Sequence, residues 1–270
     1  DELESRLGRI QAAMKSAGLD GALLLQKADL FYASGTLQNG VLFVPREGEP
    51  VLAVKRSVSR AKTESAWSDV VPLRSMRDLP GMLAERGHGR FERLGLELDV
   101  LPARNYLQYR ELFPDAALED VSPLLRTVRA VKTQYEIERV EQAAEQLSVV
   151  MAEIHAMIKE DCKREIDLAA RIEGALRRSG PKGVISTRRF GLEMQYGAVS
   201  SGASASFPTD FDGPDGMEGL FAAAPQNGGD RLLRRGEPIM VVLCGGYDGY
   251  IADKTRIFVP GGLHDEELLR

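Results

Sequence analysis

Residues 239–258 read IMVVLCGGYDGYIADKTRIF. Two runs rich in apolar and β-branched residues, 239–244 and 250–258, flank the glycine-rich sequence GGYDG at 245–249. Such runs around such a turn are typical of a β-hairpin. The stretch therefore predicts two antiparallel strands, with Asp248 and Gly249 serving the turn itself.

The longest helix is expected upstream of this hairpin. Thr133 and Glu136 have the spacing of a capping box, in which each side chain accepts a hydrogen bond from a free amide of the first turn. Apolar residues then recur every three or four positions as far as Ile158. A second helix is expected over residues 165–178, ending at Gly180.

The first 120 or so residues alternate between expected strands and helices. The strands are predicted at 22–25, 41–44, 51–55, 70–73 and 93–98, and the helices before Gly18 and at 58–67, 76–86 and 102–112. This alternation predicts an α/β domain around a mixed sheet. With a boundary near 121–133, we expect an α/β domain at 1–125 and a second domain at 126–270.

Composition excludes several classes of protein. The 270 residues carry 35 Lys+Arg against 40 Asp+Glu, and 43% are hydrophobic, which excludes wholesale disorder. The net charge of -5 argues against a nucleic-acid partner, and no apolar run is long enough to cross a membrane. Two cysteines, Cys162 and Cys244, are typical of a reducing compartment. We therefore expect a soluble, cytoplasmic protein.

Asp253 is the residue most suggestive of chemistry, because it lies inside a predicted strand. A carboxylate is costly to bury there unless it is paired or bound to a metal. If Asp253 has no role in chemistry, it is expected to form an ion pair with Arg256 or to face solvent. Cys244 is a soft metal ligand or, more commonly, a small core residue. The three histidines share no ligand spacing, and the chain lacks GxGxxG, P-loop and GxSxG motifs.

Five stretches, in the same order along the chain, resemble motifs of the creatinase, prolidase and aminopeptidase P family. They are DLFYASG at 29–35, RAVK at 129–132 followed by Glu136-Ile137, KREIDLA at 163–169, VSSG at 199–202, and residues 235–256. The resemblance implies a ribonuclease-H-like α/β domain at 1–125, followed at 126–270 by the first half of an α+β pita-bread domain, whose second half would follow Arg270. The chain is thus expected to be a fragment.

The resemblance also implies an activity. Peptidases of this family hold two divalent metals, often manganese, on two hairpin aspartates, a histidine and two glutamates, and cleave peptides with proline after the first residue. The metals activate a bridging water and polarise the scissile carbonyl. The N-terminal domain often builds a homodimer, and creatinase works on the same fold without metal.

Two positions depart from the family pattern. Asp253 matches the second hairpin aspartate and is the expected metal ligand, but the position eleven residues earlier is Val242, which cannot ligate a metal. A shifted register would offer Cys244 or Asp248 instead. The substrate-contacting histidine of the family falls on Thr209, so we expect Thr209 and the neighbouring Phe207 to bind substrate, in the irregular, Pro- and Gly-rich segment 207–230.

Three functions follow as hypotheses. The first is a metal-dependent Xaa-Pro aminopeptidase or dipeptidase, for which no catalytic residue is assigned within this chain. The second is a metal-free hydrolase of the creatinase kind, which would stay active in EDTA. The third is a non-catalytic member that binds a peptide or protein, which Val242 and Thr209 favour.

Overall fold

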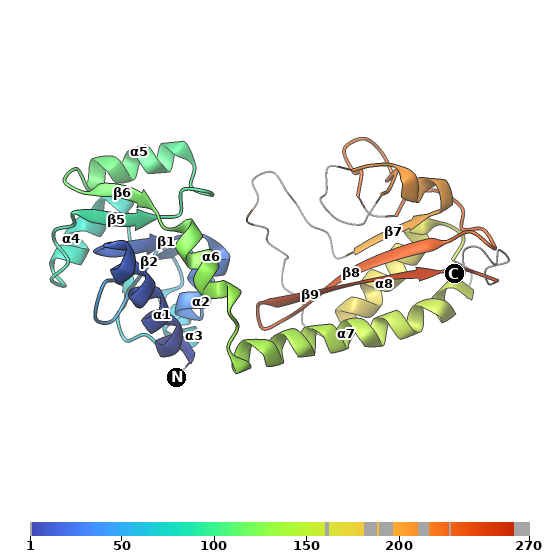
Figure 1. Cartoon of the computed structure of the whole chain (residues 1–270), viewed down its shortest axis with the longest axis horizontal. Coiled ribbons are helices and arrows are strands. Elements are labelled where there is room, and N and C mark those ends of the chain that lie inside the picture. Colours follow the sequence, from blue (N-terminus) through green and yellow to red (C-terminus); the bar gives the residue numbers. More distant parts are fainter. Residues whose placement is uncertain are drawn as a thin grey trace. The chain divides into compact units, whose positions relative to one another are not determined.

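The computed structural model describes residues 2–159, 162–180, 188, 197–209, 216–226 and 228–261. The chain divides into two compact units (Figure 1). The first comprises Asp1–Lys132 together with Arg188–Phe190, and the second comprises Thr133–Thr187 and Gly191–Arg270. Residues 262–270, which include His264, lie outside the described residues.

The first unit is built on a mixed sheet with the strand order β4-β3-β2-β1-β5-β6. Its strands are β1 (Gly21–Leu24), β2 (Gly40–Pro45), β3 (Val51–Val54), β4 (Val70–Pro72), β5 (Arg93–Leu96) and β6 (Ala117–Asp120). The β2–β3 hairpin is antiparallel, whereas β1–β5, β5–β6 and β3–β4 pair in parallel.

Helices cover both faces of this sheet. They are α1 (Glu2–Ala17), α2 (Lys27–Ser34), α3 (Val58–Glu64), η1 (Met76–Asp78), α4 (Leu79–Ala84), α5 (Ala103–Leu112) and α6 (Ser122–Ala130). Side chains of α1, α2, α3 and α6 pack on one face, and those of α4 and α5 on the other. Along β2, Leu42 and Val44 join the first core, and Val41 and Phe43 the second. No residue of β2 is polar, because helices cover both faces of the sheet at this strand.

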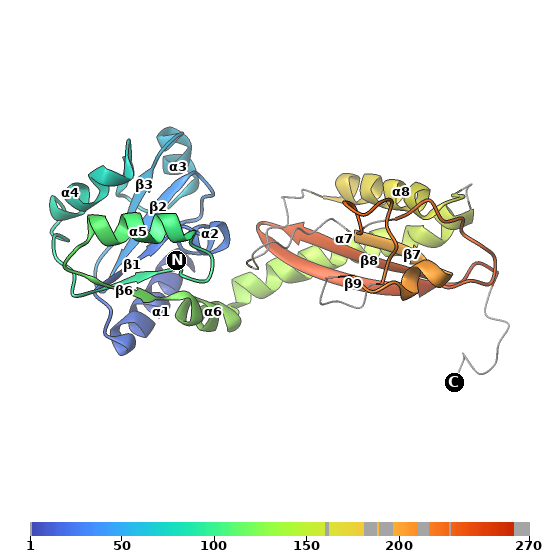
Figure 2. The ribbon, with the colours of Figure 1, turned by 90° about the horizontal axis from the view of Figure 1, so that it is seen from above.

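The second unit is an antiparallel sheet with two helices on one face. Its elements are α7 (Gln134–Lys159), α8 (Glu165–Ser179), β7 (Gly197–Ser201), η2 (Gly202–Ser206), β8 (Ile239–Tyr247) and β9 (Tyr250–Phe258), with the strand order β7-β8-β9. The three strands run side by side (Figure 2), and α7 lies along the hairpin (Figure 1). The predicted capping box is confirmed, because the amide of Glu136 donates to Thr133 Oγ1 at 3.2 Å and the amide of Thr133 to Glu136 Oε2 at 2.9 Å.

The predicted hairpin is confirmed, and its first strand continues beyond the predicted run 239–244 to Tyr247. Strand pairing continues to Tyr247↔Tyr250, so only Asp248 and Gly249 form the turn. Both have positive φ, 47° and 82°, as a type I′ turn requires. The prediction missed α2, because its 8 residues show almost no amphipathic periodicity. The predicted irregular segment 207–230 contains no helix or long strand among its described residues.

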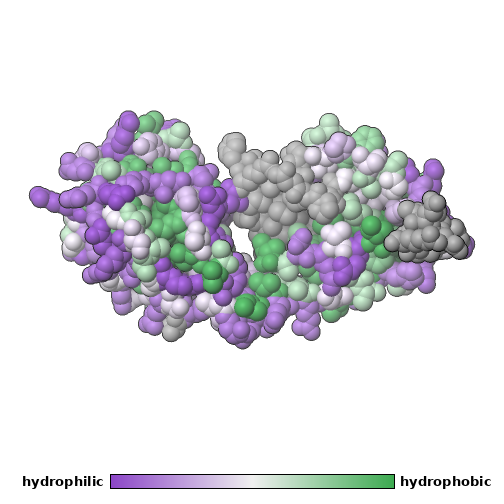
Figure 3. Space-filling model, viewed as in Figure 1, coloured by the Kyte–Doolittle hydropathy of each residue, from purple (hydrophilic) through white to green (hydrophobic). Residues whose placement is uncertain are grey.

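None of the helices in the described part of the chain is long and apolar enough to cross a membrane. On the face shown in Figure 3, hydrophilic residues predominate over the first unit and are interrupted by small hydrophobic patches.

Candidate functional site

The β8–β9 hairpin presents two chemically different faces. Ile239, Val241 and Leu243 point toward the helices and pack into the core of the second unit. The register pairs Val242 with Thr255 and Cys244 with Asp253. Because side chains alternate along a strand, these four residues share the face away from the helices, which we call the site face.

Asp253 is exposed on the site face, as the solvent-facing alternative predicted. The expected ion pair with Arg256 is wrong, since residues three apart on a strand point to opposite faces. The Arg256 guanidinium instead donates to the Thr255 carbonyl at 2.7 Å. No hydrogen bond or ion pair joins the Asp253 carboxylate to another described side chain.

Val242 lies diagonally across the hairpin from Asp253, on the same face. This is the relation in which two carboxylates could share metal ions. Val242 is instead 8% exposed and packs in an apolar cluster with Ala198, Met217 and the partly buried Met240. Met217, at 2% exposure, completes the cluster. The position that the resemblance assigns to a metal ligand is therefore part of a small hydrophobic core.

The described residues do not fit a two-metal centre. Hard divalent ions such as manganese require several oxygen ligands, and the site face offers one exposed carboxylate, Asp253, beside the Thr255 hydroxyl. Among the described residues there is no group of three or more His, Cys, Asp or Glu side chains arranged so that it could hold a metal ion. Cys244 and Asp248 do not replace the missing ligand, because Cys244 is buried and Asp248 serves the turn.

Phe207 and Thr209 follow η2, which packs against β7 and β8. Phe207 is 50% exposed, a high value for an aromatic side chain, and Thr209 is half-buried. The remainder of the predicted substrate loop, residues 210–215, lies outside the described residues. The structure places both residues just beyond the Ser201-Gly202 strand end, and their role in substrate binding stays a prediction.

Glu165 fixes this strand end and was missed in the sequence. Its side chain is fully buried and accepts four hydrogen bonds. Oε1 accepts from the Ser201 amide at 2.7 Å and the Ser201 hydroxyl at 2.8 Å. Oε2 accepts from the Gly229 amide at 3.0 Å and the Ser204 hydroxyl at 3.3 Å. One carboxylate thus joins the start of α8 to β7, η2 and the 228–229 segment, and orients the chain that leads to Phe207.

The turn of the hairpin is fastened to the start of α7. The Tyr250 hydroxyl donates to Glu136 Oε1 at 3.0 Å, and the Tyr135 hydroxyl donates to Asp248 Oδ2 at 3.1 Å. Glu136 is 1% exposed and is also the second member of the capping box. The carboxylate therefore serves both the helix cap and the strand that carries Asp253.

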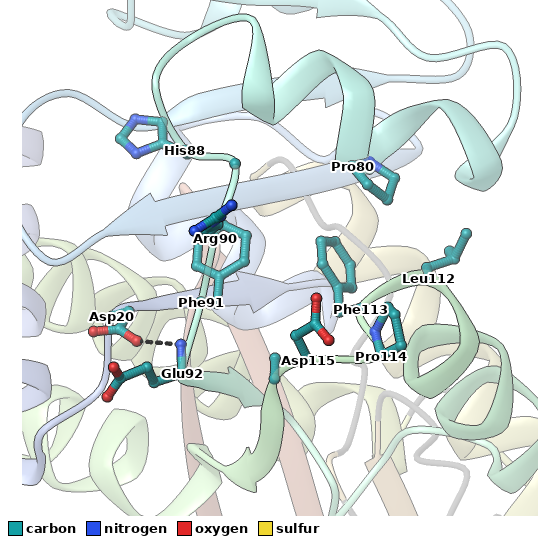
Figure 4. A pocket seen from close by; sticks show the side chains of 12 residues that line it. Asp20, Pro80, His88, Arg90, Phe91, Glu92, Leu112, Phe113, Pro114 and Asp115 are labelled. Atoms are coloured by element: carbon teal, nitrogen blue, oxygen red, sulfur yellow. Dashed lines mark hydrogen bonds between the residues drawn. The ribbon is translucent and has the colours of Figure 1, made fainter.

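Two surface pockets offer alternative sites. One, of about 420 Å³, lies in the second unit and is lined by Ser204, Leu220 and Arg231, with Glu165 in its wall. The other, of about 580 Å³, lies in the first unit with Phe91, Phe113 and Asp115 in its lining (Figure 4). It opens where β1 and β5 begin, and its Asp20 already accepts from the Glu92 amide at 2.8 Å. Neither pocket contains Asp253, Val242, Phe207 or Thr209.

Two family models match the chain in succession. The model of the creatinase/prolidase N-terminal domain matches residues 6–131, and that of metallopeptidase family M24 matches residues 138–270. The matched segments correspond to the two units of the structure.

The chain is also similar to known peptidases over nearly all its length. A Xaa-Pro dipeptidase of Pyrococcus furiosus is 23% identical over 271 residues, which cover 98% of this chain and 67% of that protein. The structure resembles a Xaa-Pro dipeptidase from Bacillus anthracis with a TM-score of 0.76 and 21% identity, covering 99% of this chain and 68% of the other. It resembles an X-Pro aminopeptidase from Thermotoga maritima with a TM-score of 0.74 and 20% identity, covering 97% and 67%. The chain thus spans about two thirds of the length of these relatives.

Proposed function

We propose that this chain recognises peptides with proline as the second residue. The chain belongs to the creatinase and prolidase family, because an N-terminal domain of that type is followed by the first half of an M24 pita-bread domain. The proposal takes its substrate class from the relatives, which are Xaa-Pro dipeptidases and an X-Pro aminopeptidase. In this chain the peptide would lie on the site face, where Asp253 is exposed and free to attract the peptide's amino group. Phe207 offers an exposed ring for the proline, and Thr209 a hydroxyl for the peptide backbone.

We propose further that this recognition is not accompanied by two-metal hydrolysis. The observation that carries the proposal is the burial of Val242 beside Ala198, Met217 and Met240. A bound metal pair would supply an activated water and a polarised carbonyl, but it needs oxygen ligands from both strands of the hairpin. An apolar side chain held in a packed cluster cannot supply one.

Metal-dependent hydrolysis of Xaa-Pro peptides, with manganese as the expected metal, is the second candidate. Asp253 favours it, because an unpaired, exposed carboxylate in a strand has no structural role among the described residues. Hydrolysis without metal, as in creatinase, is a variant of this candidate. Chelation distinguishes the two, because only the metal-free activity would persist in EDTA.

Binding and cleavage can be measured on the same samples of the protein at its natural length. Calorimetry with Leu-Pro, and with Leu-Ala as control, measures recognition of the proline. Chromatography then measures free proline after long incubation with Mn²⁺ or with EDTA. We expect preferential binding of Leu-Pro, weaker binding by Thr209→Val, and no free proline under either condition.

Each other outcome has a definite meaning. Equal affinity for Leu-Pro and Leu-Ala would overturn the proposed recognition. Proline release in Mn²⁺ alone would establish the metal-dependent hydrolase, and release that persists in EDTA the metal-free one. Val242→Asp tests whether the missing ligand is the obstacle, with Val149→Asp as its control, since Val149 is 51% exposed on α7 of the same unit. A gain of proline release in Val242→Asp alone would identify the valine as the change that abolished hydrolysis.

A homodimer and a cytoplasmic location complete the proposal. The dimer is supported by the family resemblance, and the cytoplasmic location by the reduced state expected of Cys162 and Cys244, neither of which forms a disulfide in the structure. Sedimentation analysis of the purified protein tests the dimer.

A further inference from the structure

A cluster of carboxylates occupies the carboxyl ends of β1 and β5 in the first unit. These strands are parallel neighbours, and β2 pairs with the opposite edge of β1, so the chain leaves β1 and β5 in different directions. Such a point in an α/β sheet is where ligands commonly bind. Asp29 lies in the first turn of α2 after β1, and Glu97 and Asp99 follow β5 directly.

Two of these carboxylates are almost completely buried. The side chains of Asp29 and Glu97 are each 1% exposed, and that of Asp99 is 23% exposed. Glu97 Oε2 accepts from the amides of Leu25 and Gln26 at 2.6 and 2.7 Å. Glu97 Oε1 has no hydrogen-bond donor, although it is buried. An acceptor left in this state is costly unless a cation lies close to it.

The guanidinium of Arg188 is that cation. Arg188 groups with the first unit, and its side chain is 17% exposed. Its Nε and Nη2 donate to the two oxygens of Asp99 at 2.7 and 2.9 Å, as a fork. Its Nη1 donates to Asp29 Oδ2, and Nη2 lies 3.6 Å from the unpartnered Glu97 Oε1.

The three carboxylates suit a guanidinium better than an ammonium. A planar fork of N–H groups can reach three carboxylates in one plane, whereas an ammonium is a point charge without that geometry. Arg129 binds Asp29 Oδ1 at 2.6 Å and Arg126 lies 3.8 Å from Asp99, so α6 places two further positive charges beside the cluster. Arg188 is the cation that contacts all three carboxylates.

We propose that Asp29, Glu97 and Asp99 form a guanidinium-binding pocket in the N-terminal domain, with Arg188 as its resident occupant and with affinity for any other guanidinium that reaches it when Arg188 is absent. The ligand class is a guanidinium, carried either by this chain's own arginine or by a free guanidinium compound. The pocket is independent of the peptide site proposed above, which lies in the other unit.

The test replaces the occupant and supplies its chemistry from solution. Arg188→Ala is titrated calorimetrically with guanidinium chloride at low millimolar concentration, with sodium and tetramethylammonium chloride as controls. Thermal unfolding of the first unit is followed through Trp67, the one tryptophan of the chain, which is buried in that unit. Arg104→Ala is the matched control, because Arg104 is exposed on α5 of the same unit.

We expect Arg188→Ala to unfold at a lower temperature and to recover in guanidinium with saturation, but not in the two control salts. Its affinity for guanidinium should exceed that of the wild type and of Arg104→Ala by roughly tenfold or more, because only its pocket is empty. Adding Asp99→Asn to Arg188→Ala should abolish the response. If Arg188→Ala does not fold, Arg188→Lys replaces it, because a lysine cannot form the fork. Equal guanidinium binding by wild type and variant, or none by either Arg188 variant, would overturn the proposal.

Discussion

The burial of Glu165 leads to a strong prediction for the second unit. Glu165→Gln keeps the size of the side chain but replaces one carboxylate oxygen with an NH₂ group. Either orientation of the amide sets that NH₂ against a backbone donor, the Ser201 amide or the Gly229 amide. The hydroxyls of Ser201 and Ser204 can rotate to accept, but a backbone N–H cannot.

The cost follows from these contacts. One buried amide loses its acceptor, which costs about 1–3 kcal/mol. The remaining bonds lose the assistance of the negative charge, since bonds to charged groups contribute about 1.5–3 kcal/mol and neutral ones about 0.5–1.5 kcal/mol. Together these changes should destabilise the second unit by about 3–5 kcal/mol, at the upper end of what single substitutions do.

Urea unfolding can assign this loss to one unit. Circular dichroism follows both units, whereas fluorescence follows only the first, through Trp67. With a dependence on urea of about 1–3 kcal/mol per molar, the second-unit transition should move down by about 2 M, and the Trp67 transition should stay in place. Glu153→Gln, at an exposed position on α7, is the control and should move neither transition.

A shift in Glu165→Gln no larger than that of Glu153→Gln would refute the reasoning, because the four donors would then be satisfied without the carboxylate. An equal shift of the Trp67 transition would also refute it, since the effect would not be confined to the second unit. Loss of Leu-Pro binding at urea concentrations where both units stay folded would show that Glu165 also positions the segment carrying Phe207 and Thr209.

Three further predictions concern single side chains. Burial, and then the neighbouring Asp29 carboxylate, raise the pKa of Glu97 to about 8, so its neutral form is favoured in the folded state. The stability that Glu97 contributes is therefore present below about pH 4.5 and is lost as the pH rises to 8, and Glu97→Gln should flatten that fall in urea midpoints followed through Trp67. Tyr250→Phe removes the hydrogen bond to Glu136 and should lower the free energy of unfolding of the second unit by about 1–2 kcal/mol, measured by urea unfolding with circular dichroism. Tyr247→Phe is the control, because the Tyr247 hydroxyl makes no hydrogen bond to a described residue, and it should cause no measurable change. Val242→Asp should destabilise the same unit by about 2–5 kcal/mol without metal, because it buries a carboxylate among apolar side chains, and a loss no greater than that of Val149→Asp would contradict the packing described here.

Much of the second unit could be predicted because its signals are local. The capping box joins Thr133 to Glu136, three residues away, and the hairpin turn depends on Asp248 and Gly249 alone. The identity of the family could also be inferred, since its motifs recur in order along the chain. In the first unit, the short helix α2 escaped prediction because tertiary packing, and not periodicity, holds it.

The functional face was harder to predict. The predicted strand 239–244 stopped three residues short of the observed end of β8, and a slip of one residue in the pairing moves every side chain to the other face of a sheet. Only the two-residue turn seen in the structure sets Val242 and Asp253 on one face. The sequence indicated that position 242 lacks a metal-ligating side chain, and the structure shows that Met217 packs against Val242.

The sequence by itself determined the order of the elements, the turn, the helix cap and the departure at Val242, because each depends on neighbouring residues or on the identity of one side chain. The tertiary structure alone decided the surroundings of the buried carboxylates. The donors of Glu165 lie 36 to 64 residues away along the chain, and Arg188 lies 159 residues from Asp29. A buried charge must find its partners wherever the fold brings them, and no local pattern in the sequence records where that will be.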